Sequence, residues 1–262
     1  MQTKNVALTT DLGTVTLALA EQQGGIGCRD FVVLIHGLGC SKEFFAEVFR
    51  RSEFRGLTLV AVDLLGFGDS ERPAAFSYAM EDQARILETL LDRYPACRLH
   101  IMAHSMGGAV GLLFSKSLFE RVGSFVSIEG NLISEDCDLL SRRAVRRSFD
   151  RFESGFLSRL RKTFQGDDLL RSALDKASPV AFYQSSASLV AWSDSGRLLD
   201  RFKGLGCAKH YVYGEQSHPA RVLERLEGIE AHGIEKSGHF VMRDNPEAFY
   251  SRLSRIIESS ST

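Results

Sequence analysis

The sequence lacks an excess of charge of either sign, because its 32 Lys and Arg residues face 33 Asp and Glu residues. This balance gives no reason to expect a nucleic-acid partner or a membrane surface. No run of about 18 apolar residues occurs, so we expect no transmembrane helix. The first 21 residues alternate apolar and polar side chains and lack the charged start and apolar core of a signal peptide. These absences predict a cytoplasmic protein.

Cysteines are few, and they lack any Cys-x-x-Cys spacing. The five are Cys28, Cys40, Cys97, Cys137 and Cys207. An odd, scattered set predicts free thiols in a reducing compartment, with neither disulfides nor a cysteine zinc site. Cys40 follows a glycine loop and could be reactive, but a packed or idle thiol is the favoured interpretation.

Along the chain, apolar segments typical of strands alternate with segments that have helical periodicity. Apolar strand candidates cover residues 15–19, 31–35, 57–62, 99–102 and 124–128. Helix candidates cover residues 42–51, 80–94 and 106–121. Parallel strands covered on both faces are almost wholly apolar, as these middle strands are. The alternation predicts an α/β fold, with a mostly parallel central sheet and helices on both faces.

The pattern changes after Gly130. Residues 131–203 have helical periodicity without a strong strand, and the strand pattern resumes at residues 209–213. Further candidates are a helix at 219–226, a strand at 228–234 and a helix at 246–257. We therefore expect a core of residues 1–130 and 204–262, and a helical cap of residues 131–203. The basic stretch 141–147 with Arg151 could attract an anionic substrate, but nearby acidic residues favour a solvated helix face.

Residues 102–108, Met-Ala-His-Ser-Met-Gly-Gly, have the pattern of a nucleophile elbow with Ser105 at its tip. A strand that turns into a helix this sharply strains the serine and needs small neighbours, here Ala103 and Gly107. The serine would then project its hydroxyl over a helix N-terminus. Ala103 departs from Gly-x-Ser-x-Gly, and an ordinary glycine-rich turn is the alternative interpretation.

A serine nucleophile needs a histidine base oriented by a carboxylate. His239 is the preferred base, because Gly238 permits a tight loop and a final helix follows. We interpret the remaining histidines as lying in strands, turns or the elbow itself: His36, His100, His104, His210, His218 and His232.

With these residues in place, the chain resembles serine hydrolases of the α/β-hydrolase superfamily, in the esterase-like branch with a helical cap. Four segments carry the resemblance in the family's order: residues 31–39, residues 63–70, the elbow and residues 238–240. The resemblance implies an oxyanion hole from the backbone N–H groups of Leu38 and Met106. It also implies that Asp63 and Asp69 shape a loop. Dehalogenase-like and epoxide-hydrolase-like relatives carry aspartate at the elbow, so Ser105 implies an acyl-enzyme.

The orienting acid departs from the family's usual position. That position follows the strand after the cap, where this chain has Gly214-Glu-Gln-Ser217, and Ser217 carries no charge. Some members of the family place the acid after the preceding strand, where Glu129 stands. Glu129 is therefore the preferred acid, and Glu215 is the alternative.

These residues predict a serine hydrolase that cleaves small-molecule carboxylic esters with Ser105, His239 and Glu129. We expect no metal or organic cofactor in the reaction. A thioesterase or a carbon–carbon bond hydrolase would use the same groups, and a non-catalytic ligand-binding protein on this fold is the other alternative.

Overall fold

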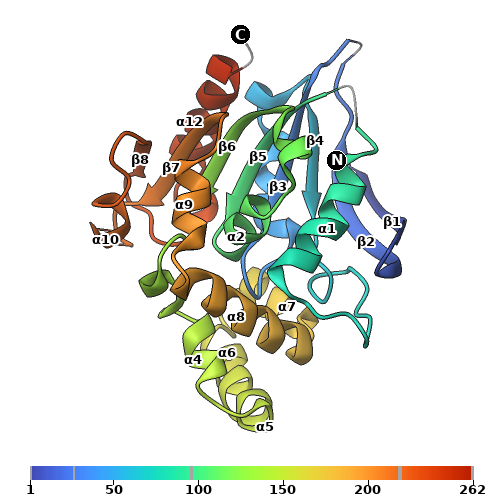
Figure 1. The fold of residues 1–262 in the computed structure, drawn as a ribbon, viewed down its shortest axis with the longest axis vertical. Helices are drawn as coiled ribbons and strands as arrows, with labels where there is room; N and C mark the ends of the chain where they lie inside the picture. The colour runs from blue at the N-terminus through green and yellow to red at the C-terminus, as the bar shows by residue number, and fades with distance from the viewer. Residues whose placement is uncertain (1, 26, 95–96, 218–219, 261–262) are drawn as a thin grey trace.

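The computed structural model describes residues 2–25, 27–94, 97–217 and 220–260. Its eight strands form one sheet in the order β1-β2-β4-β3-β5-β6-β7-β8 (Figure 1). β1 and β2 form an antiparallel hairpin, β2 is antiparallel to β4, and every later pair is parallel. The strands are β1 (Gln2–Thr10), β2 (Gly13–Gln22), β3 (Asp30–Ile35), β4 (Thr58–Val62), β5 (Arg98–His104), β6 (Val122–Ile128), β7 (Ala208–Gly214) and β8 (Glu230–Ile234). The expected mostly parallel sheet is confirmed.

The middle strands are apolar because both of their faces are covered. In β3, Phe31, Val33 and Ile35 belong to one apolar cluster. Val32 and Leu34, which point to the opposite face, belong to a second cluster. All five residues are fully buried, so continuous apolar sequence here reflects two cores rather than one.

Helices from different parts of the chain complete the two cores. The first cluster includes residues of α1 (Met80–Leu91), α2 (Met106–Leu112) and α9 (Arg197–Lys203). The second includes residues of the 3₁₀ helices η1 (Lys42–Arg50) and η2 (Ser52–Phe54), of α11 (Val241–Asp244) and of α12 (Pro246–Ser260). α10 (Ala220–Leu223) lies between β7 and β8. Residue 219, where we expected a helix to begin, lies outside the described residues.

The single helix expected at residues 106–121 is two helices. α2 ends at Leu112, and α3 (Lys116–Phe119) starts after a break. The Ser115 hydroxyl accepts the backbone N–H of Leu118 and caps the new start. The prediction missed this N-cap, which satisfies backbone groups that a continuous helix would satisfy internally.

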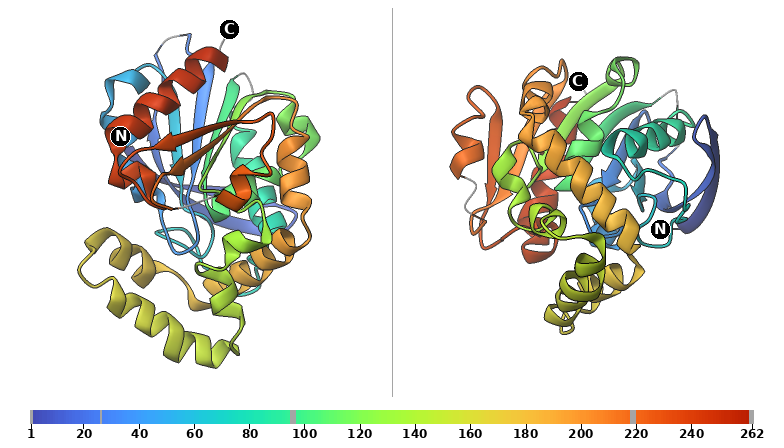
Figure 2. Two further views of the ribbon diagram at one scale, coloured as in Figure 1. Left: turned by 90° about the vertical axis from the view of Figure 1, so that its left-hand side faces the viewer. Right: turned by 60° about the horizontal axis from the view of Figure 1, so that its bottom comes forward.

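The segment between β6 and β7 is helical. It comprises η3 (Ser134–Cys137), α4 (Ser141–Val145), α5 (Phe149–Arg151), the π-helical η4 (Phe152–Leu157), α6 (Ser158–Thr163), α7 (Asp168–Lys176), α8 (Pro179–Asp194) and α9. Figures 1 and 2 show α4 to α7 beyond one end of the sheet, below the strands. Ion pairs connect α7 and its N-cap residue Asp167 to the segments around the sheet, with Lys176 to Asp69 at 2.6 Å and Arg243 to Asp167 at 2.9 Å. Among the described residues, no helix is long and apolar enough to cross a lipid bilayer.

Candidate active site

Ser105 lies between the end of β5 and the start of α2, with a φ of 51°. Few non-glycine residues adopt this region, so the backbone at Ser105 is strained. Gly107 is required two residues later, because a Cβ there would lie 2.5 Å from the carbonyl oxygen of Ile35. The tight approach of α2 to β3 therefore explains the small residues of the elbow.

Backbone hydrogen bonds continue past the strand ends and connect the elbow to β6. The Ser105 N–H donates to the carbonyl of Ile128 at 2.9 Å, and the Asn131 N–H donates to the carbonyl of Ser105 at 3.5 Å. The Ser105 hydroxyl donates to Asn131 Oδ1 at 3.4 Å. No motif in the sequence pointed to Asn131 as a functional residue, although it lies in the loop that carries Glu129.

Glu129 and His239 lie together, although 110 residues separate them in the chain. His239 Nδ1 lies 3.2 Å from Glu129 Oε2. An ionised carboxylate can only accept, so Nδ1 carries the proton and Nε2 keeps its lone pair. This is the tautomer that a general base needs.

Two donors from the end of β7 hold the other oxygen of Glu129. Its Oε1 accepts the Gly214 N–H at 2.7 Å and the Ser217 hydroxyl at 2.5 Å. The side chain of Glu129 is nearly buried, at 7% exposure, and a buried carboxylate is costly unless it is hydrogen-bonded. Ser217 therefore occupies the family's usual acid position as a donor to an acid on the neighbouring strand.

Glu215, the alternative acid, is exposed in the turn after β7. Its backbone N–H donates to Ile234, and no hydrogen bond or ion pair among the described residues joins its side chain to His239. The structure thus brings Glu129, and not Glu215, to the histidine.

The loop that carries His239 packs tightly against the end of β7. A Cβ on Gly214 would lie 2.3 Å from the Gly238 carbonyl oxygen, so only glycine fits there. The Gly238 N–H donates to Asp244 Oδ2 at 2.9 Å, and His104 Nε2 donates to the His239 carbonyl at 2.9 Å. In the described part of the chain, no hydrogen bond joins His239 to Ser105, although both line one cavity.

The predicted oxyanion loop follows β3. His36 Nδ1 donates to the Gly37 carbonyl at 2.7 Å, and its Nε2 accepts the Leu64 N–H at 3.1 Å. Burial lowers the pKa of His36, so the ring is neutral and holds the loop in place. Leu38 lines the cavity beside Ser105, and Met106 is the first residue of α2. Within the described residues, neither the Leu38 nor the Met106 N–H donates a hydrogen bond.

Asp63 stabilises the neighbouring loop instead of reaching the cavity. Its carboxylate accepts the Lys42 backbone N–H at 2.6 Å and the Lys42 Nζ at 2.8 Å. Lys42 Nζ also donates to Asp69 at 2.8 Å. Burial disfavours the Lys42 cation, but these carboxylates outweigh the burial and raise its pKa. These contacts agree with the loop-shaping role expected for Asp63 and Asp69.

Ser105 and His239 open onto a cavity of about 290 Å³. Its polar end also includes Asn131, Asp136 and Arg143. Most of its remaining wall is apolar, from Leu139, Leu140, Leu160, Phe164, Leu170, Leu174, Leu189 and Phe240. All of these except Phe240 come from the segment between β6 and β7.

The other aromatic residues of that segment form its core. Phe152 contacts Phe149, Phe156, Phe182 and Tyr183, with ring centroids 5.3–6.3 Å apart. The indole N–H of Trp192 donates to Glu81 instead. Among the aromatic residues of residues 131–203, Phe164 alone lines the cavity within the described part of the chain.

Two titratable groups in the cavity have shifted pKa values. Burial raises the pKa of Cys40 to about 12, so its thiol is protonated and unreactive near neutral pH. This agrees with the packed thiol favoured from the sequence. Burial also raises the pKa of Asp136 to about 6, against the lowering effect of hydrogen bonds from the N–H groups of Ile133 and Leu132.

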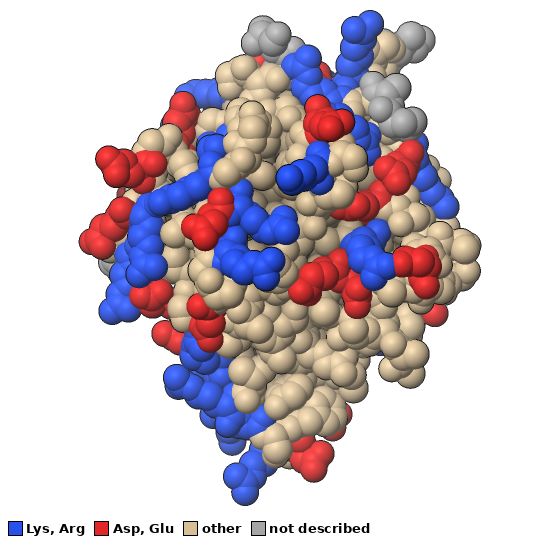
Figure 3. Space-filling view, viewed as in Figure 1, with Lys and Arg blue, Asp and Glu red and all other residues tan. Residues whose placement is uncertain are grey.

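The basic stretch around α4 divides between paired and exposed side chains. Arg142 pairs with Asp138 at 2.9 Å and with Asp194 at 2.5 Å. Arg143 and Arg147 lie over the ring of Phe156. Basic side chains gather at the lower end of the molecule, whereas both signs mix on the upper part of this face (Figure 3).

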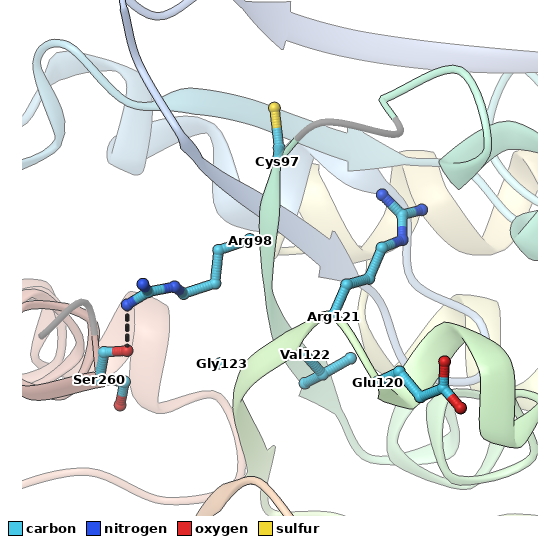
Figure 4. A pocket seen from close by; sticks show the side chains of 7 residues that line it. All are labelled: Cys97, Arg98, Glu120, Arg121, Val122, Gly123 and Ser260. Atoms are coloured by element: carbon cyan, nitrogen blue, oxygen red, sulfur yellow. Dashed lines mark hydrogen bonds between the residues drawn. The ribbon is translucent and has the colours of Figure 1, made fainter.

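A second hollow, of about 380 Å³, lies at the opposite end of the strands, where β5 and β6 begin (Figure 4). Arg98 there donates to the Ser260 carbonyl at 2.8 Å. Arg121 donates to the carbonyls of Tyr94 and Leu91. Both cations are thus engaged in structural hydrogen bonds, and we assign this hollow no chemistry.

The chain belongs to the alpha/beta hydrolase family, whose sequence pattern matches residues 32–252. Lipase 1 of Psychrobacter immobilis is 33% identical over 110 residues, which are 40% of this chain and 34% of the lipase. The chain thus spans about a third of that relative. A haloalkane dehalogenase of Agrobacterium fabrum is 27% identical over 87% of this chain and 84% of its own length.

The solved structures agree on the fold. An esterase from Thermogutta terrifontis superposes with a TM-score of 0.78 at 19% identity, over the full length of both chains. An esterase from Exiguobacterium antarcticum superposes with a TM-score of 0.75 at 18% identity, over 99% of this chain and all of the esterase. The predicted α/β-hydrolase fold is confirmed.

Proposed function

We propose that this protein is a serine hydrolase that cleaves carboxylic esters through an acyl-enzyme on Ser105. The observation that carries the proposal is the contact between His239 Nδ1 and Glu129 Oε2 at 3.2 Å, at the edge of the cavity onto which Ser105 opens. The lipase and esterase relatives support the same class of reaction. The serine at the elbow separates the proposal from the reaction that the dehalogenase relative's name describes.

In the proposed mechanism, the Ser105 hydroxyl leaves Asn131 and turns toward His239. Its Oγ attacks the ester carbonyl carbon while His239 Nε2 takes the proton. The imidazolium then gives this proton to the departing alcohol, which leaves an acyl ester on Ser105. A water molecule, deprotonated by the same nitrogen, attacks that ester. The bond from the acyl carbon to Ser105 Oγ breaks, Oγ takes the proton back from His239, and the acid is released. Glu129 stays ionised and stabilises the imidazolium in both steps.

The N–H groups of Leu38 and Met106 would bind the oxyanion of each tetrahedral intermediate. Both groups have no acceptor among the described residues, and Met106 begins a helix whose dipole favours negative charge. Losing one such donor typically costs about 3–4 kcal/mol of transition-state stabilisation.

We also propose that residues 131–203 act as a cap that provides the acyl pocket. Its leucines and Phe164 form most of the apolar wall, which favours an apolar acyl chain over a charged one. The cavity of about 290 Å³ favours esters of small to medium size. All five cysteines are free thiols, which is consistent with the cytoplasmic location predicted from the sequence.

A fluorophosphonate probe tests the nucleophile. We expect the probe to label the wild-type protein and to leave Ser105→Ala unlabelled, since an activated serine attacks the phosphorus, displaces fluoride and becomes phosphonylated. Ser141→Ala is the matched control, because Ser141 lines the same cavity and its hydroxyl donates to the Cys137 carbonyl. A folded wild-type protein without labelling would favour the ligand-binding alternative. A panel of p-nitrophenyl esters and thioesters of increasing chain length would then define the bond and the acyl group.

A further inference from the structure

A cluster of three potential ligands lies on β7 and β8, outside the cavity. The parallel register pairs His210 with Glu230 and Val212 with His232. Because alternate residues of a strand project from one face, His210, Glu230 and His232 share a face of the sheet. β8 is the last strand in the order, at the edge seen beside β7 in Figure 1.

The spacing of the three ligand atoms fits one metal ion. His210 Nδ1 lies 3.1 Å from His232 Nε2 and 3.3 Å from Glu230 Oε2. His232 Nε2 lies 3.7 Å from Glu230 Oε2. A tetrahedral zinc site with bonds of about 2.0–2.1 Å holds its ligand atoms roughly 3.3 Å apart. Of the described residues, this group is the one that brings three such side chains within 4.8 Å.

The chemistry of the ligand set fits the same ion. Two imidazoles and one carboxylate suit zinc and neighbouring transition metals. An imidazole nitrogen with a free lone pair can bind a cation, and His210 Nδ1 and His232 Nε2 face each other at 3.1 Å. Glu230 contributes negative charge and is 72% exposed, which leaves the cluster open to solvent. The guanidinium of Arg252 on α12 is the opposing positive charge that acts on both histidines.

We propose that His210, Glu230 and His232 bind one divalent transition-metal ion of the zinc class, with a remaining coordination position toward solvent. The ion would cross-link the edge strand β8 to β7. This function is separate from the proposed hydrolysis, because none of the three residues lines the cavity. We expected no metal from the sequence, since the spacing of these residues is uninformative until the register of β7 and β8 brings them together.

Titration with Co²⁺ tests the site. The full-length protein without a histidine tag is stripped with a chelator, desalted and titrated with Co²⁺ while visible absorption is recorded. We expect one ion per chain, displaced by Zn²⁺. A ligand that binds the folded state alone at a hundred times its Kd should raise the unfolding temperature by about 5 °C.

Matched variants locate the ion. His232→Gln and Glu230→Gln should remove or weaken the Co²⁺ spectrum, and circular dichroism checks that they fold. Glu227→Gln removes a carboxylate just before β8 and should leave the titration unchanged. His239→Ala removes the imidazole of the proposed active site and should also leave it unchanged, whereas Arg252→Gln should tighten binding.

Three outcomes would overturn the proposal. The first is the absence of one-to-one binding, and the second is binding by His232→Gln equal to that of the wild type. The third is loss of binding in His239→Ala, which would place the ion at Ser105 and His239 instead. Labelling of Ser105 by a fluorophosphonate is measured on the chelator-stripped protein and needs no metal ion, so the two proposals fail separately.

Discussion

The chain segments at the ends of β6 and β7 lie side by side, and they contribute different groups to the contact between Glu129 and His239. Glu129 directly follows β6, and its carboxylate contacts His239. β7 ends in Gly214, and Ser217 lies in the turn that follows it. The Gly214 N–H and the Ser217 hydroxyl both donate to that carboxylate. The comparison teaches that carrying the negative charge and holding it in place are separable tasks. In the proposed triad, Glu129 would carry the charge, and Ser217 at the position usual for the acid would only hold it in place.

The largest effect should come from removing the charge at the end of β6. We expect Glu129→Gln to lower kcat by about 10³–10⁴-fold, because the amide would present an N–H to His239 Nδ1 and favour the wrong tautomer. Steady-state hydrolysis of p-nitrophenyl acetate measures the effect, and circular dichroism checks the fold.

Glu215→Gln is the matched control for Glu129→Gln. It removes a carboxylate from the end of β7, where the side chain is exposed and does not contact His239. We expect its kcat to stay near that of the wild type. Normal turnover by Glu129→Gln together with a large loss in Glu215→Gln would reverse the comparison and assign the acid to β7.

A smaller effect should come from moving the charge between the two strand ends. The double variant Glu129→Gly/Ser217→Asp places a carboxylate where the Ser217 hydroxyl lies, 2.5 Å from Glu129 Oε1. Glycine suits the positive φ of 48° at position 129. We expect the double variant to exceed the kcat of Glu129→Gly alone by roughly tenfold, which is about 1.4 kcal/mol. Equal rates would show that β7 cannot supply the charge.

The smallest effect should come from weakening the support that β7 gives. Ser217→Ala removes one of the two donors to Glu129 Oε1, and we expect kcat to fall about fivefold, for a loss of about 1 kcal/mol. A carboxylate with one donor fewer is more basic and holds the imidazolium proton more strongly. The acidic limb of the kcat/KM profile should therefore move to higher pH.

Ser217→Thr is the control for this position, because threonine keeps a hydroxyl. We expect it to retain the wild-type rate and the wild-type pH profile. If Ser217→Ala matched the wild type in both measurements, the hydroxyl of Ser217 would be a local turn contact without influence on Glu129.

The sequence was sufficient to predict the fold and to nominate Ser105, His239 and Glu129 as candidate residues. Apolar runs such as β3 and β4, separated by helical periods, predict a parallel sheet because few other arrangements bury both faces of a strand. The elbow and the Gly238-His239 loop could be recognised in the sequence, because a tight turn of the backbone needs small residues at particular positions. The break between α2 and α3 was missed because one serine cap decided it.

Contacts that depend on strand register could not be predicted from the sequence. Ser217 donates to Glu129 because β6 and β7 pair in one particular register, and a local pattern carries no information about that pairing. The same holds for Asn131, which reaches Ser105 across the end of β5. It also holds for His232, which lies in the strand predicted at residues 228–234 but meets His210 only through the pairing of β7 with β8. These residues became candidates only through three-dimensional proximity.

The positive φ angles of Ser105 and Glu129 have a consequence for how this protein can change. Each angle, 51° and 48°, lies in a region that costs a non-glycine residue roughly 1–3 kcal/mol. Glycine would relieve that strain at either position and would delete a proposed catalytic group. Selection for stability alone therefore favours an inactive variant at these two positions. A screen for thermostability without an activity assay would therefore enrich variants that have lost Ser105 or Glu129.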